Sequence, residues 1–188
     1  MKITKLETFL VKPRWLFLKV FTDDKLVGLG EPILEGRAKT CAQAVAELEP
    51  YLIGKDPTRV VHHWQAMYRS SYTRSMPILV GALSGIEMAM WDVMGKALGV
   101  PVWKLFGGSV RRRVRVYTGI GGDSPESIAD SARKRVAEGF TALKFDPLPG
   151  GYADMGQDRL TKTARDLVAA AREGGGPDLD LIIEVHRK

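Results

Sequence analysis

The chain has 188 residues, of which 45% are hydrophobic and 27% charged, an ordinary composition for one large globular domain or two small ones. Charges interrupt each apolar stretch before the roughly 18 residues that a membrane span needs, and the charged N-terminus is unlike a signal peptide. Cys41 is the single cysteine, which excludes an internal disulfide and suits a reducing cytoplasm. The net charge of +6 includes one tight basic cluster, at residues 111–113. We therefore expect a cytoplasmic protein with no membrane and no nucleic-acid partner.

The first part of the chain predicts an antiparallel meander of strands, at residues 8–11, 15–22 and 26–31. Apolar residues occupy both faces of the second strand, which predicts that this strand is covered on both sides. A helix is predicted next, at residues 40–52, because its apolar residues recur with helical spacing.

A second helix is predicted to begin with Asp56 as its N-cap and Pro57 at its first position, and to run to Tyr68. Two adjacent histidines lie within it. His62 and His63 would point about 100° apart on a helix, so they cannot easily share one metal ion. We expect both at the surface or its boundary.

A long helix is predicted from residue 77 to about residue 98. Its apolar side chains recur at spacings of three and four: Ile78, Ala82, Ile86, Ala89, Met90, Met94 and Ala97. Gly81 and Gly85 would each cost about 1 kcal/mol against alanine, so we expect them where another backbone approaches closely. Gly99 is placed to end this helix. A meander followed by helices is typical of an α+β domain, which would end near residue 108.

Strands and helices alternate in the remainder of the chain. Strands are predicted at residues 114–120, 141–146 and 181–186, with helices starting at Ser124 and at Asp158 between them. Short apolar strands in a β-α-β-α-β order predict a parallel sheet.

Chemically reactive groups of parallel α/β folds collect at the carboxyl ends of the strands. Here that rule selects Lys144, Asp146, Glu184 and His186. Each pair is two residues apart on its strand, so its members face the same side and all four could converge on one cavity. The alternatives are an ion pair between Lys144 and Asp146, a Glu184 that caps a helix or pairs with Arg187, and a solvated histidine.

Two consecutive motifs resemble one enzyme family. AMWDVMGK at residues 89–96 and PVWKLFGG at residues 101–108 are similar to the junction between the two domains of the mandelate racemase/muconate-lactonising branch of the enolase superfamily. The resemblance implies an enolase-like N-terminal capping domain at residues 1–108. Residues 109–188 would then be a partial (β/α) TIM-like barrel with its first three strands, because a whole barrel takes about 250 residues.

Within that branch, the carboxylate-x-histidine pattern of the last strand and the segments KPRWLFLKVFTDD, GEPILEGR and YLIGKDPTR look most like acid-sugar (galactonate-type) dehydratases. The resemblance implies a Mg²⁺ cofactor with Glu184 as a ligand, at a position where the family usually has aspartate. It makes His186 the catalytic acid and Lys144 a second catalytic residue. The substrate would be a small sugar acid.

Further residues would contact that substrate. By resemblance these are Asp146 on the second barrel strand and Arg14, Trp15 and Arg37 in two loops of the capping domain. The family's other metal carboxylates and its base belong to later strands. We therefore expect this chain to be inactive alone and to need a complementing barrel half or a homo-oligomer. The alternatives are a racemase, epimerase or lactonising enzyme of the same family, and a non-catalytic fragment or assembly module.

Overall fold

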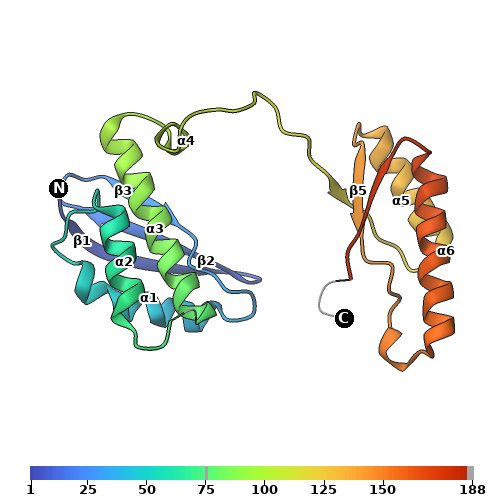
Figure 1. Ribbon diagram of the computed structural model, residues 1–188, viewed down its shortest axis with the longest axis horizontal. Coiled ribbons are helices and arrows are strands. Elements are labelled where there is room, and N and C mark those ends of the chain that lie inside the picture. Colours follow the sequence, from blue (N-terminus) through green and yellow to red (C-terminus); the bar gives the residue numbers. More distant parts are fainter. Residues whose placement is uncertain (75, 186–188) are drawn as a thin grey trace. The chain divides into compact units, whose positions relative to one another are not determined.

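A computed structural model describes residues 1–74 and 76–185, and these form two compact units, Met1–Val110 and Arg111–Lys188 (Figure 1). The first unit holds an antiparallel sheet in the order β1-β2-β3, and the second a parallel sheet in the order β4-β5-β6. This confirms the predicted fold class: an antiparallel meander with helices, followed by parallel β-α-β-α-β units.

The first sheet consists of β1 (Ile3–Val11), β2 (Trp15–Thr22) and β3 (Val27–Gly30). Every second residue of β2, from Leu16 to Thr22, is buried, whereas Trp15 and Phe17 are 40% and 43% exposed. The expectation that β2 is covered on both sides is therefore wrong for the described residues of this unit. The helices cover one face, and on the other face the rings of Trp15 and Phe17 stack on each other.

The helices of the first unit are α1 (Ala38–Leu52), α2 (Val60–Ser70), α3 (Pro77–Leu98) and the short α4 (Val102–Leu105). By length and composition α3 could cross a membrane, but it is the central helix of this core, with Ala82, Ile86 and Met90 fully buried. It ends at Gly99, whose φ of 67° is left-handed, as predicted from the sequence.

Close contact between the backbones of α3 and β3 explains the small residues of both elements. A Cβ built on Gly30 would lie 2.0 Å from the carbonyl oxygen of Gly85, and one on Gly85 would lie 2.3 Å from the Pro32 nitrogen. Neither distance is possible for real atoms, so only glycine fits. The predicted close approach is confirmed at Gly85.

The start of α2 differs from the prediction. The Asp56 carboxylate accepts hydrogen bonds from the Thr58 amide and hydroxyl, 2.9 and 2.8 Å away, and the helix begins four residues later, at Val60. His63 is 2% exposed and not a boundary residue: one ring nitrogen contacts the Tyr51 hydroxyl and the other the Asp56 carbonyl, both at 2.9 Å. The turn at Asp56 brings the Asp56 carbonyl oxygen within hydrogen-bonding distance of the His63 ring. Both nitrogens of the buried ring therefore have a hydrogen-bond partner.

The second unit consists of β4 (Thr118–Gly119), α5 (Pro125–Ala137), β5 (Ala142–Phe145), the 3₁₀ helix η1 (Tyr152–Asp154), α6 (Gln157–Gly175) and β6 (Asp180–Ile183). The Ser124 hydroxyl caps α5 by accepting from the Ser127 amide, as predicted. Ile128 and Ala171 pack with Phe145 in one cluster, so α5 and α6 cover one face of the sheet.

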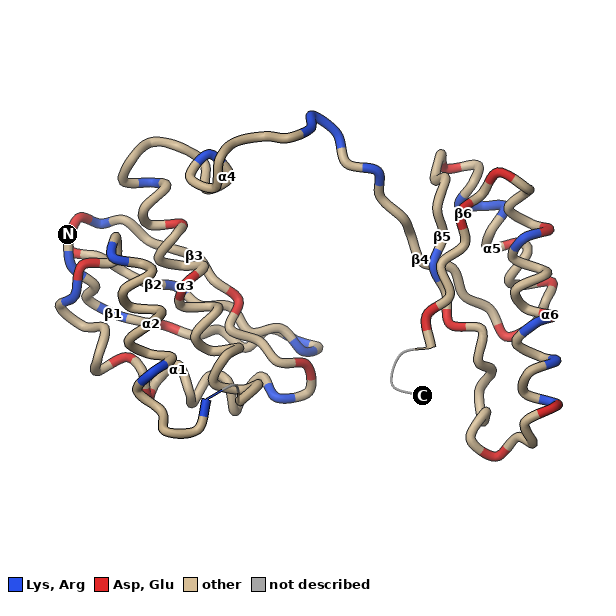
Figure 2. The backbone as a smooth tube through the Cα atoms, viewed as in Figure 1, with Lys and Arg blue, Asp and Glu red and all other residues tan. Residues whose placement is uncertain are grey.

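The strand predicted at residues 114–120 is reduced to two residues. β4 pairs only with β5, and Val114 and Val116 are 69% and 61% exposed. An edge strand forms backbone hydrogen bonds on one side only, so fewer contacts stabilise its extended conformation. The basic cluster at residues 111–113 lies in the segment between α4 and β4, as Figure 2 shows.

Candidate functional site

The sheet of the second unit places Lys144 and Glu184 on the face away from its helices. Leu143 and Phe145 are buried against α5 and α6, so Lys144 between them points to the opposite face. Glu184 follows β6 directly, and its amide donates to the Phe145 carbonyl at 3.0 Å, which continues the parallel pairing. The Lys144 Nζ lies 2.7 Å from the Glu184 Oε2. Two of the four predicted strand-end residues therefore form an ion pair.

Tyr117 is an aromatic neighbour of this ion pair. The Lys144 Nζ lies 5.6 Å from the centre of the Tyr117 ring. The hydrogen bond to Glu184 is the main cause that raises the pKa of Lys144, with smaller contributions from the charge of Glu184 and from Tyr117. Lys144 therefore carries its proton at neutral pH, and in this state it is a cation and a hydrogen-bond donor.

Asp146 is placed in the loop after β5. Its carboxylate accepts a hydrogen bond from the Leu148 amide at 3.0 Å. It also lines a hollow of about 170 Å³ together with Asp123 and with Thr163 and Asp166 of α6. The alternative in which Asp146 is the partner of Lys144 is not what the structure shows, since that ammonium pairs with Glu184. His186 and Arg187 lie outside the described residues.

Arg14, Trp15 and Arg37 belong to the first unit. The Arg14 guanidinium forms an ion pair with the Glu35 carboxylate and lies 5.5 Å from the centre of the Trp15 ring. Arg14 and Arg37 line one hollow of about 420 Å³ together with Lys39. The two loops that the sequence singled out, residues 12–15 and 35–39, are thus neighbours, and cations dominate the hollow between them.

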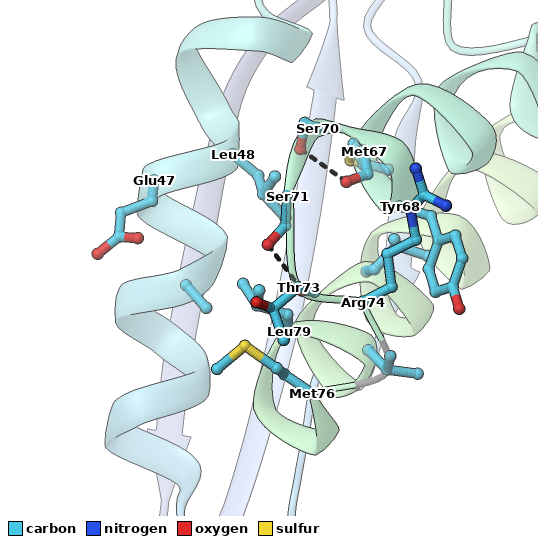
Figure 3. Close-up of a pocket in the computed structure, with 13 residues that line it drawn as sticks. Glu47, Leu48, Met67, Tyr68, Ser70, Ser71, Thr73, Arg74, Met76 and Leu79 are labelled. Carbon is cyan, nitrogen blue, oxygen red and sulfur yellow. Dashed lines mark hydrogen bonds between the residues drawn. The ribbon is translucent and has the colours of Figure 1, made fainter.

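The pocket in Figure 3 was not found from the sequence. It has a volume of about 310 Å³ and lies between α1, α3 and the segment that links α2 to α3. Its apolar lining includes Leu48 and Leu79, while hydroxyl groups come from the linking segment, where Ser71 donates to the Thr73 carbonyl at 2.8 Å. The polar composition of residues 70–76 was the only signal in the sequence. None of the predicted site residues within the described part of the chain lines this pocket.

Within residues 1–74 and 76–185, no three His, Cys, Asp or Glu side chains gather closely enough to hold a metal ion. Glu184 supplies one carboxylate, an oxygen ligand of the type that Mg²⁺ prefers. Among the described residues, Glu184 could therefore supply one ligand to a Mg²⁺ site.

Comparisons with known proteins agree with this architecture. Residues 7–107 match the family described as mandelate racemase / muconate lactonizing enzyme, N-terminal domain. Among curated proteins, the D-galactonate dehydratases of Verminephrobacter eiseniae and Pectobacterium atrosepticum are 44% and 43% identical over 189 aligned residues. Each alignment covers 99% of this chain and 48% of the relative, so the chain spans about half the length of the curated relatives it matches.

Solved structures give the same result. A member of the enolase superfamily from Salmonella Typhimurium aligns over 98% of this chain and 55% of its own, with a TM-score of 0.91 and 30% identity. A mandelate racemase/muconate lactonizing enzyme from Jannaschia sp. CCS1 aligns over 99% of this chain and 54% of its own, with a TM-score of 0.88 and 33% identity. The chain therefore belongs to the mandelate racemase/muconate lactonizing enzyme family of the enolase superfamily.

Proposed function

We propose that this chain contributes its residues to the Mg²⁺-dependent dehydration of a sugar acid, an aldonate of the galactonate type. The observation that carries the proposal is the pairing of Lys144 with Glu184 at neighbouring strand ends, on the sheet face that the helices leave open. The relatives named D-galactonate dehydratase, 44% and 43% identical over nearly the whole chain, support this reaction class.

In this proposal residues 1–108 are the capping domain and residues 109–188 the first three strands of a (β/α)-barrel. The division of the chain into compact units at residues 110 and 111 supports this assignment. The barrel interior would then be the sheet face that carries Lys144, Glu184 and Tyr117. Its exposed apolar residues, which include Ile182, would become covered when further strands close the barrel.

The reaction would begin with transfer of the proton α to the substrate carboxylate to a base, which the resemblance assigns to a later barrel strand. Negative charge then develops on the carboxylate oxygens, and the Lys144 ammonium can stabilise it as a donor that already holds its proton. Loss of the β-hydroxyl needs a proton, because hydroxide is a poor leaving group. His186 is assigned this role, since histidine can hold and release a proton near neutral pH. Asp146 would contact a substrate hydroxyl.

Glu184 would hold Mg²⁺ in this site, and the bound ion would supply further stabilisation of the negative charge of the enediolate. Glu184 has a second function in the described residues, because its carboxylate also fixes the Lys144 ammonium at 2.7 Å. The cationic hollow of Arg14, Arg37 and Lys39 is assigned to the capping loops that contact the acid substrate. Arginine suits this role because its planar fork matches a carboxylate.

The experiment is a chimera, since the expected activity needs later barrel strands. Residues 1–188 replace the matching segment of the D-galactonate dehydratase of V. eiseniae, and the product is assayed with D-galactonate and other aldonates in the presence of Mg²⁺. A 2-keto-3-deoxy acid formed by the chimera, and lost in a His186→Asn variant, is the expected result. The chain alone is expected to be inactive.

Other outcomes separate the alternatives. A chimera that exchanges the α-proton with solvent deuterium but loses no water would support a racemase or epimerase. A folded chimera that does neither would contradict an enzymatic role of these strand ends and leave an assembly module. Homo-oligomer formation, measured by light scattering on the chain and on the chimera, tests whether another copy is the partner.

A further inference from the structure

We propose that Tyr117 is a positioning residue, which holds the Lys144 ammonium in place against Glu184 through the face of its aromatic ring. The geometric part of this proposal concerns the chain alone. Its catalytic consequence rests on the proposed function, in which Lys144 stabilises the charge that develops on the substrate.

The strand registers bring these side chains into one row. Gly119 of β4 lies opposite Lys144 of β5, and Ile182 of β6 lies on the other side of Lys144. Tyr117 is two residues before Gly119, and Glu184 is two residues after Ile182. Both contact the Lys144 ammonium, so both lie on its side of the sheet. The row therefore crosses three neighbouring strands diagonally, from Tyr117 through Lys144 to Glu184.

Gly119 lies directly opposite Lys144 in this row. A Cβ at Gly119 would itself meet only the Lys144 carbonyl, at 4.0 Å, so the backbone does not require glycine here. The Lys144 Nζ lies 5.6 Å from the centre of the Tyr117 ring.

Two contacts of different kinds then define the position of the ammonium. Glu184 attracts it from one side at 2.7 Å, and the negative face of the Tyr117 ring attracts it from the other. A lysine side chain has a flexible four-carbon stem and three rotatable donors, so a single partner leaves its head free to turn around that partner. Tyr117 adds a second point of attachment, through its ring and through a hydrogen bond of its side chain that contributes to the raised pKa of Lys144. At least one N–H thus stays available for substrate.

The proposal is tested on the chain by ¹³C NMR with lysine labelled at Cε. The Lys144 signal is identified by its loss in a Lys144→Met variant. We expect its ε-protons to be displaced upfield by the Tyr117 ring, and this displacement to persist in Tyr117→Phe and vanish in Tyr117→Leu. Tyr72 is fully exposed, so Tyr72→Leu is the matched control and should leave the signal unchanged. A Lys144 signal that does not move in Tyr117→Leu overturns the proposal.

A Glu184→Gln variant separates the two contacts. If the ring holds the ammonium, part of the upfield displacement remains without the carboxylate charge. A complete loss of the displacement in Glu184→Gln would show that Glu184 alone sets the position, and would overturn the proposal. Circular dichroism of each variant excludes a change of fold as the cause.

The catalytic consequence is measured in the chimera. Tyr117→Leu should lower kcat about two- to five-fold, the effect expected for loss of an exposed cation–π contact. Tyr117→Phe, which keeps the ring, should have a higher kcat than Tyr117→Leu. An unchanged kcat in an active chimera would overturn the catalytic part. A chimera inactive in every form would contradict the proposed function, while the NMR result on the chain would still decide whether Tyr117 positions Lys144.

Discussion

The contact between α3 and the segment after β3 predicts that two glycines of the same helix differ clearly in their response to the same substitution. A Cβ on Gly85 would lie 2.3 to 2.4 Å from three atoms of Pro32, two of them backbone. Carbon atoms in contact are normally about 3.5 to 4.0 Å apart, so the Pro32 segment must move by roughly 1 Å or more. A Cβ on Gly81 would meet its nearest neighbour, the Ile33 carbonyl oxygen, at 3.3 Å.

The magnitude follows from two opposing effects. Replacing glycine with alanine inside a helix stabilises by about 1 kcal/mol. Overpacking costs about 1–3 kcal/mol and occasionally more, and the upper end applies at Gly85 because backbone, not a flexible side chain, has to yield. We expect Gly85→Ala to destabilise the first unit by about 2 kcal/mol or more, and Gly81→Ala to be neutral or to stabilise it by up to about 1 kcal/mol.

Tryptophan fluorescence during urea unfolding is a selective assay for this prediction. The chain has 4 tryptophans, and all of them, Trp15, Trp64, Trp91 and Trp103, belong to the first unit. The two variants should therefore shift the fluorescence midpoint in opposite directions or by clearly different amounts. Equal midpoints for Gly85→Ala and Gly81→Ala would refute the close approach of α3 to Pro32.

Three further predictions concern the pH dependence of stability, the contacts of Arg115 with Thr141 and Asp180 (called the Arg115 clamp), and the N-cap of α5. Burial is the main cause that lowers the pKa of His63 below 6.5, so the unfolded chain takes up the proton first. The free energy of unfolding should fall as pH decreases from about 6.5 toward the folded-state pKa, and His63→Gln should remove this part of the pH dependence of urea unfolding. Arg115 donates to the Thr141 hydroxyl at 2.8 Å and to its carbonyl at 2.7 Å, and it also pairs with Asp180. Arg115→Lys should cost up to about 1 kcal/mol and speed hydrogen exchange of the Asp180 amide, and unchanged exchange would contradict the clamp. Ser124→Ala should destabilise the second unit by about 1 kcal/mol in a circular-dichroism melt, whereas Ser124→Asp, which keeps a capping oxygen, should not.

Helices with strong local signals could be predicted from the sequence. The long helix from Pro77, its end at Gly99 and the Ser124 cap depend on residues close together in the chain, and each is confirmed. Even the reason for Gly85 could be predicted, because a costly glycine inside a helix calls for a close neighbour. The identity of that neighbour, Pro32, could not, since it depends on long-range packing.

Features that depend on distant partners were predicted less well. His63 looked like a boundary residue because the Asp56 turn, which delays α2 and supplies its carbonyl acceptor, leaves no periodic pattern. The apolar residues at 114–116 predicted a full strand, but a strand extends only where a neighbour pairs with it, and β4 pairs with β5 over two residues. Likewise, the apolar residues on both faces of β2 predicted that it is covered on both sides, but in the first unit the helices cover only one of them.

The strand-end site depends both on local sequence patterns and on pairing between residues far apart in the chain. Alternation along a strand is local, so the face of β5 on which Lys144 lies could be predicted, but β5 ends at Phe145 and Asp146 belongs to the loop that follows. The partner of Lys144 is set by register, which aligns it with Gly119 and Ile182 and thereby brings Tyr117 and Glu184 toward its ammonium. A shift of β6 by one residue would turn Glu184 to the helix-covered face, where an ion pair with Lys144 is impossible. The 2.7 Å contact is therefore evidence for the register as much as for the site, and the substitutions at Tyr117 and Glu184 test both together.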